Sequence, residues 1–245
     1  MTETTDADVL PSKEIAEIFR VRWEKCRLTK ASIPDRLSKI LPRTRGGLYS
    51  TAYDLAMDVC MEHCQKERIT NLWTGNGLDM FFGGGIDPSK YKASSKQEFH
   101  NQFWQNSFKL LKNRFYSQDD KDLNLQARPY GIKLVMPFES IDTILTSRSI
   151  RADLLFLNNE DKYPVRILAH KYGVLLREAR RHKDPLQHSS GIFDFLRDYM
   201  YETLPKMTQD GVNFDLTKDY FENNPNTDLQ LFLELLTSNG SQKQS

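Results

Sequence analysis

The stretch that most constrains the fold covers residues 150–173, where a polar turn joins two apolar segments. Residues 150–157 and 165–169 are rich in Leu, Ile, Val and Phe, and side chains of this kind favour β-strands. Residues 158–161 read Asn-Asn-Glu-Asp. Asn and Asp favour turns because they tolerate left-handed backbone geometry and bond their own backbone. The pattern predicts an antiparallel hairpin.

Polar side chains gather at one end of this predicted hairpin. If the turn closes near Asp161, Asp153 lies across from Ala169 on the second strand. Successive side chains of a strand point to opposite faces, so Lys171 shares a face with Asp153. The sequence therefore predicts an acid and a lysine at one edge of the sheet.

This arrangement resembles the core of the restriction-endonuclease-like, or PD-(D/E)xK, nuclease superfamily, and the resemblance covers roughly residues 95–207. It implies that Asp153 holds Mg²⁺ and that Lys171 positions the attacking water. Mg²⁺ needs hard oxygen ligands, which carboxylates supply. The chain departs from the family pattern in two places. Ala169 stands where the second acid belongs, and Arg151-Ala152-Asp153 replaces the family's Pro-Asp.

The missing carboxylate would have to come from another element. Glu178, on the helix predicted after the hairpin, and Glu139, at the end of the preceding strand, are the two candidates. The alternative interpretation is a hairpin of this kind in a protein that has no catalytic activity. In that case the acid at its rim bonds a backbone group or a neighbouring arginine.

The densest basic stretch of the chain lies in residues 174–183, directly after the hairpin. On a helix, Arg177, Arg180 and Arg181 share a face, which suits contacts with a phosphate backbone. A solvated face, with Glu178 bridging to the arginines, explains the same pattern. Nucleic acid is therefore one candidate partner.

The balance of charged residues gives the chain no overall charge that would favour binding to nucleic acid or membranes. The chain has 245 residues, 34 Lys and Arg against 33 Asp and Glu, and a net charge of +1. Any basic surface must therefore be local. No apolar run reaches the length of a membrane span, and residues 1–10 do not resemble a signal peptide. We expect an intracellular protein, in the nucleus or the cytoplasm.

The three cysteines do not form a disulfide framework, because their number is odd. Cys60, His63 and Cys64 fall on one face of a helix predicted over residues 51–68, close enough together to share a metal ion. No complementary pair of ligands accompanies them in the sequence. Small buried cysteines on a helix are the alternative.

The predicted fold class is α+β, mainly helical with a small central sheet. Residues 130–136, 150–157 and 165–169 would form the sheet, flanked by helices over residues 95–116 and 174–183. The first of these helices carries an aromatic stripe typical of a core. This order of helix, three strands and helix is the restriction-endonuclease-like core. The predicted divisions are a disordered lead (1–10), a helical region ending in a Gly-rich loop (11–92), the α+β core (93–237) and a disordered tail (238–245).

Two functions are compatible with these patterns. The first is a nuclease-fold protein that binds or cleaves nucleic acid with a divalent metal, either active or catalytically degenerate. The second is a non-catalytic adaptor that binds a protein partner through amphipathic helices, predicted near residues 12–28, 216–221 and 228–236.

Overall fold

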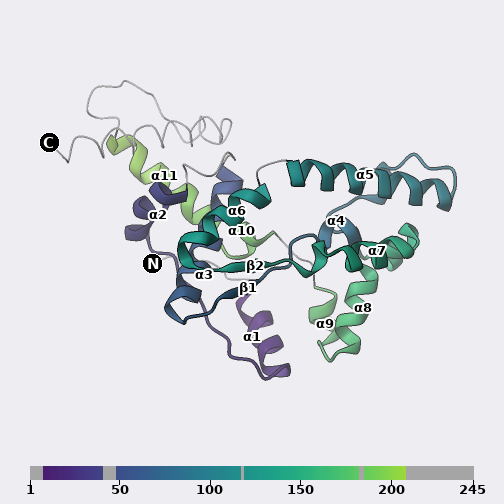
Figure 1. Ribbon diagram of the computed structural model, residues 1–245, viewed down its shortest axis with the longest axis horizontal. Helices are drawn as coiled ribbons and strands as arrows, with labels where there is room; N and C mark the ends of the chain where they lie inside the picture. Colours follow the sequence, from purple (N-terminus) through teal and green to yellow (C-terminus); the bar gives the residue numbers. More distant parts are fainter. Residues whose placement is uncertain (1–7, 41–47, 117–118, 182–184, 208–245) are drawn as a thin grey trace. The chain divides into compact units, whose positions relative to one another are not determined.

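The computed structural model describes residues 8–40, 48–116, 119–181 and 185–207. The described part is mostly helical, with one small sheet of two parallel strands (Figure 1). Its α-helices are α1 (Val9–Ile18), α2 (Ile33–Ile40), α3 (Leu48–Lys66), α4 (Leu78–Phe82), α5 (Lys96–Tyr116), α6 (Asp119–Ala127), α7 (Ile141–Ser149), α8 (Tyr163–Lys171), α9 (Leu176–Ala179), α10 (Leu186–Ser189) and α11 (Ile192–Met207). The strands are β1 (Asn71–Trp73) and β2 (Lys133–Val135), and five 3₁₀ helices complete the set: η1 (Lys30–Ser32), η2 (Pro88–Lys90), η3 (Arg128–Tyr130), η4 (Pro137–Glu139) and η5 (Ala152–Asn159).

The chain forms two compact units, each made of segments that are distant in the sequence. Unit 1 comprises Met1–Lys13, Trp23–Glu67 and Lys183–Ser245, and unit 2 comprises Glu14–Arg22 and Arg68–His182. The boundary predicted near residue 92 therefore falls inside unit 2. Of the two segments predicted to be disordered, residues 1–7 and 238–245 lie outside the described residues, whereas Val9 and Leu10 belong to α1.

Unit 1 is a small helical bundle built around α3. The apolar side chains of α2 recur at helical spacing, so that one face of the helix is buried. The core of the bundle consists of residues from α2, α3 and α11, namely Ile33, Leu37, Ile40, Ala52, Leu55, Leu196 and Met200. The helix predicted over residues 51–68 is confirmed as α3.

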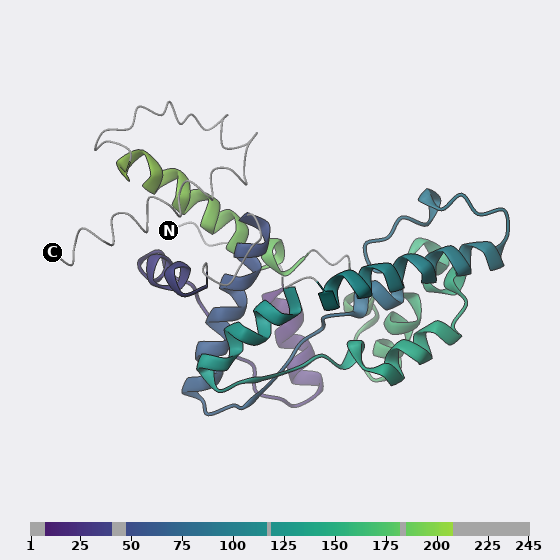
Figure 2. The same cartoon turned by 45° about the horizontal axis from the view of Figure 1, so that its top comes forward.

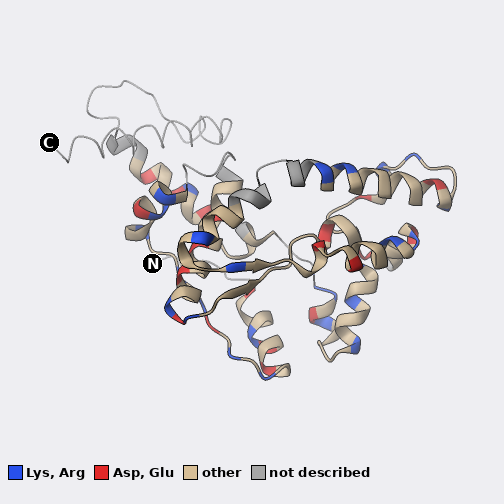
Figure 3. Ribbon diagram, in the orientation of Figure 1, with Lys and Arg blue, Asp and Glu red and all other residues tan. Residues whose placement is uncertain are grey.

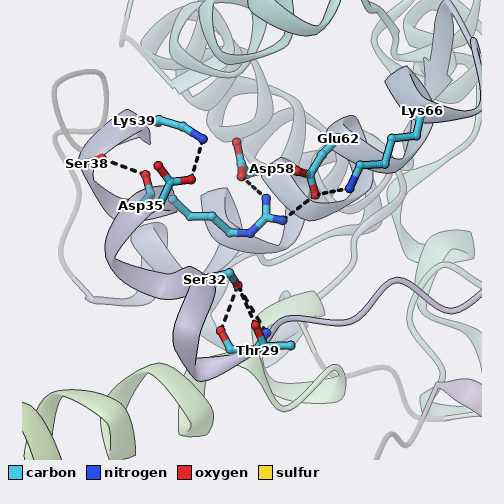
Figure 4. A network of polar contacts seen from close by, with 9 residues as sticks. Thr29, Ser32, Asp35, Ser38, Lys39, Asp58, Glu62 and Lys66 are labelled. Atoms are coloured by element: carbon cyan, nitrogen blue, oxygen red, sulfur yellow. Dashed lines mark hydrogen bonds and ion pairs between the residues drawn. The ribbon is translucent and has the colours of Figure 1, made fainter.

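A buried ion-pair network joins α2 to α3 in unit 1. The guanidinium of Arg36 donates to Asp58 at 2.5 Å and to Glu62 at 2.6 Å, and Lys66 adds a second cation beside Glu62 (Figure 4). The hydrogen bond from Arg36 lowers the pKa of Glu62. Removing one partner of a buried pair leaves the other charge without compensation, which is costly.

Unit 2 is organised by the aromatic stripe of α5. Phe103 and Trp104 are buried against Phe81 and Phe82 of α4 and against Ala152 and Leu155 of η5. Figures 1 and 2 both show α4 beside α5. The prediction of an aromatic core helix over residues 95–116 is confirmed. However, it packs on other helical elements, whereas a sheet was expected.

The predicted hairpin is wrong. Residues 152–159 form the 3₁₀ helix η5, and residues 165–169 lie inside α8. A short apolar run cannot be assigned to a strand or to a buried helical segment by periodicity alone. Ala152 and Leu155 are fully buried at a spacing of three, which matches the three residues per turn of a 3₁₀ helix. Pro164, in the first turn of α8, also favours a helix start.

The sheet differs accordingly from the predicted three strands. β2 confirms part of the strand predicted over residues 130–136, and it pairs in parallel with β1, with Leu72 opposite Leu134. β1 comes from the segment predicted as a Gly-rich loop. The three-stranded restriction-endonuclease-like core is not formed by the described residues.

A polar network fixes the start of α8 in unit 2. Lys162 adopts a left-handed backbone (φ 54°), and its buried ammonium group donates to Asp79 of α4 at 2.8 Å. Arg166 donates to Asp161 and to the backbone carbonyls of Ala179 and Arg181. The network therefore ties α8 both to α4 and to α9.

We expect Asp58→Ala to lower the free energy of unfolding by about 3–5 kcal/mol, because it leaves the Arg36 guanidinium buried without its closest carboxylate. The matched control is Asp35→Ala, which breaks the exposed pair with Lys39 and should cost less than about 1 kcal/mol. Urea unfolding followed by circular dichroism measures both values. Equal losses in the two variants would contradict the assigned role of the network.

Candidate interaction surface

Asp153 lies in η5, held by two cations. Arg151 donates to both carboxylate oxygens at 2.9 Å, and the Lys96 ammonium lies 3.3 Å away. Burial by itself raises the pKa of Asp153, but the hydrogen bonds from Arg151 and Lys96 lower it below its ordinary value. This geometry matches the interpretation in which the acid pairs with a neighbouring arginine. A role for Asp153 as a metal ligand stays a prediction.

The other residues of the predicted catalytic set lie on separate elements. Lys171 is the exposed last residue of α8 and forms no ion pair with any described residue. Glu178 lies in α9, where Arg177 donates to one of its oxygens at 3.1 Å and the second oxygen is buried without a hydrogen-bond partner. Glu139 ends η4, where it fills the space that a side chain at Gly77 would need. Over the described ranges, no three His, Cys, Asp or Glu side chains form a group that could hold a metal ion.

The arginines predicted to contact phosphate are largely paired with acids. Arg177 donates to Glu14 at 2.6 Å, and Arg180 lies 3.3 Å from Glu160. α9 ends at Ala179, so Arg180 and Arg181 lie beyond the helix on which they were expected to share a face with Arg177. Basic and acidic residues are interleaved along the described helices (Figure 3). Nucleic-acid binding by these arginines stays a prediction.

The cysteines form a thiol cluster in unit 1 that the sequence pattern did not reveal. Cys60 is hydrogen-bonded to Cys26, which comes from the segment between α1 and α2. His63 pairs with Glu24. Burial, with further contributions from Cys26 and Cys64, raises the pKa of Cys60 to about 12. All three thiols are free; Cys64 is buried, whereas Cys26 and Cys60 are partly buried.

An exposed apolar surface lies where α8, α9 and the end of α1 meet in unit 2. The Arg177–Glu14 ion pair joins α9 to α1, and a Cβ atom at Gly173 would lie 3.7 Å from Cγ2 of Ile18. The segments 14–18 and 173–177 therefore run side by side in opposite directions. We call the exposed side chains of this region the α8 surface: Ile18, Phe19, Val21, Leu168, Tyr172, Leu175 and Leu176.

The α8 surface depends on the helical conformation of residues 163–171. Leu168 and Tyr172 share a face because they are four residues apart on a helix, and Leu175 follows after the turn. Leu168 is 50% exposed, Tyr172 67% and Leu175 45%. Sequence reasoning missed this surface because it assigned the segment to a strand. The spacing 168, 172, 175 after Pro164 is the signal that could have revealed it.

Comparison of the chain with protein-family models and with curated proteins finds no match. Within the part of the chain that the structure describes, no helix is long and apolar enough to cross a membrane.

We expect Cys60 to react with iodoacetamide at pH 8 about 1,000-fold more slowly in the native protein than in urea. A thiol with a pKa of about 12 is almost entirely protonated at that pH, whereas an unfolded cysteine titrates near pH 8.5 and the thiolate is the reactive form. Peptide mass spectrometry of labelled protein measures each cysteine separately. Labelling of native Cys60 at the unfolded rate would contradict the burial of this thiol.

Proposed function

We propose that this chain is a non-catalytic adaptor that binds a protein partner through the α8 surface. The observation that carries the proposal is the exposure of seven large apolar side chains from three neighbouring elements. Single exposed apolar residues are normal on a protein surface, whereas contiguous groups of them mark interaction sites. Here the exposed residues come from segments that the Arg177–Glu14 ion pair and the approach of Ile18 to Gly173 bring together. Tyr172 and Phe19 add aromatic rings, which are enriched at protein interfaces.

We infer that the partner supplies an amphipathic helix with acidic side chains beside its apolar face. Arg20 and Lys171 border the α8 surface, and neither forms an ion pair with a described residue. Glu17 of α1, three residues before Arg20, is also exposed. A helix laid on a surface formed by helices is a common mode of peptide recognition, and opposite charges at the rim favour the correct partner.

The sequence patterns assign the adaptor hypothesis to amphipathic terminal helices. The helices predicted near residues 216–221 and 228–236 lie outside the described residues. The helix predicted over 12–28 is shorter, because α1 ends at Ile18 and Arg20 takes a left-handed backbone (φ 54°). The end of α1 nevertheless contributes Ile18, Phe19 and Val21 to the α8 surface.

The metal-dependent nuclease hypothesis stays a prediction that the same protein can test. Asp153 is occupied by Arg151 and Lys96, and this arrangement does not favour metal binding. Cleavage of DNA or RNA with Mg²⁺ or Mn²⁺, lost in folded Asp153→Ala and Lys171→Ala variants, would replace the adaptor proposal with the nuclease. Salt-dependent binding without cleavage would indicate a nucleic-acid-binding protein.

We expect Leu168→Glu to weaken partner binding at least about tenfold, because it buries a charge in the centre of the interface. A photoreactive amino acid at position 172 identifies the partner in cells, and the purified partner is then titrated against each variant by calorimetry. The matched control is Leu110→Glu on α5, since Leu110 is as exposed as Leu168 (49% against 50%).

Leu110→Glu should bind the partner as wild type does, and circular dichroism checks that both variants are folded. Crosslinking with equal yield from position 110 would contradict the proposal. So would unchanged affinity of Leu168→Glu for the purified partner. A crosslinked segment without acidic side chains would contradict the inferred partner chemistry alone.

A further inference from the structure

Two side-chain contacts in unit 1 hold the segment of residues 23–28 against α3. The carboxylate of Glu24 pairs with His63, and the thiol of Cys60 is hydrogen-bonded to Cys26. Position 24 therefore lies beside position 63, and position 26 beside position 60. The segment and α3 run in opposite directions here, and the contact between the two thiols is part of this register.

The third cysteine of the chain differs from this pair in its surroundings. Cys64 lies one turn beyond Cys60 on the same face of α3. It is buried, with 7% of its surface exposed, whereas Cys26 and Cys60 are both partly accessible. The hydrogen bond to Cys26 comes from Cys60. Cys26 and Cys60 are therefore the two thiols that both touch each other and can be reached from solvent.

We propose that Cys26 and Cys60 form a reversible disulfide, which locks residues 23–28 onto α3 when the chain meets an oxidising low-molecular-weight disulfide. These residues belong to no helix or strand. They can therefore shift and bring the two sulfurs to the bonding distance of about 2 Å without breaking secondary structure. In a reducing compartment, protein disulfides are usually transient and sense the redox state, which suits a bond that forms and is reduced again.

The bond forms by two exchange steps between sulfur atoms. The Cys26 thiol loses its proton, and its sulfur attacks one sulfur of the small disulfide, whose S–S bond breaks and releases a first thiolate. The Cys60 sulfur, once deprotonated, then attacks Sγ of Cys26 and releases the second thiolate. The two leaving thiolates take up the two protons. Two protein thiols are thus oxidised, and one small disulfide is reduced to two thiols.

The surroundings of the two sulfurs set the order of these steps. Burial raises the pKa of Cys26, and the hydrogen bond from Cys60 opposes that rise. Burial raises the pKa of Cys60 to about 12. Because the thiolate is the nucleophile, Cys26 attacks the small disulfide and Cys60 resolves the mixed disulfide. The contact between the two sulfurs compensates in the second step for the small fraction of Cys60 thiolate.

Equilibration of the full chain with mixtures of reduced and oxidised glutathione tests the proposal. Samples are quenched with acid, unfolded and alkylated, and peptide mass spectrometry identifies the crosslinked cysteines. The wild type and Cys64→Ser should both form the bond between Cys26 and Cys60, and dithiothreitol should reverse it. The equilibrium constant for the bond should be at least about 100-fold larger in the native chain than in urea, because a long loop separates the two thiols in the unfolded chain.

Two single variants test the order of the steps. Cys60→Ser should accumulate a mixed disulfide between Cys26 and glutathione, because no thiol resolves it. Cys26→Ser should form much less of the corresponding adduct at Cys60. Thermal unfolding measures the lock itself: the oxidised wild type should unfold at a higher temperature than the reduced protein, whereas Cys60→Ser should show no such increase.

A wild type that forms no crosslink under these conditions overturns the proposal. A bond between Cys26 and Cys64 in its place also overturns it, as do equal equilibrium constants in the native and the unfolded chain. These three outcomes are measured without substituting Cys26 or Cys60, so they do not depend on whether those variants fold. They leave the adaptor proposal unaffected, because the α8 surface contains neither cysteine.

Discussion

The burial of the aromatic stripe on α5 is the constraint on which unit 2 depends. Phe99 and Phe103, four residues apart, and the adjacent Trp104 present large rings to one cluster, and a single helix cannot bury them by itself. α4 and η5 cover these rings, and the edge-to-face contacts between Phe156 and Phe103 and between Phe103 and Trp104 fix how they do so. Because η5 is needed as a cover, residues 152–159 are not available for a sheet.

The polar network at the start of α8 follows from this packing. η5 ends at Asn159, and the chain must then reverse to begin α8, which it does with Lys162 in a left-handed conformation. Such a backbone costs of the order of 1–3 kcal/mol in a residue other than glycine. The buried ammonium group of Lys162 donates to the exposed carboxylate of Asp79, and this ion pair links the start of α8 to α4. The exposed side of α8 is then determined.

The basic residues near α9 and the exposed apolar residues of α8 differ in whether they have partners within the chain. Most of the cations that looked suited to phosphate are already neutralised by acids in the same unit, as Arg177 is by Glu14 and Arg180 by Glu160. Leu168 and Tyr172 at the end of α8 are exposed instead, and Lys171 between them forms no ion pair with a described residue. The proposed adaptor function therefore rests on the α8 surface and not on these arginines.

The sequence by itself determined the helices that the spacing of their own apolar residues reveals. The spacing of Leu55 and its neighbours predicted α3, the aromatic periodicity predicted α5 as a core helix, and the mainly helical fold class was also confirmed. The candidate site was not predictable, because the segment around Asp153 has no period long enough to separate a strand from a short helix. Only the tertiary structure decided that it is helical, since the rings of α5 require a cover with buried residues at a spacing of three. That choice placed Asp153 in η5 and Lys171 at the end of α8, and it left Leu168 and Tyr172 exposed.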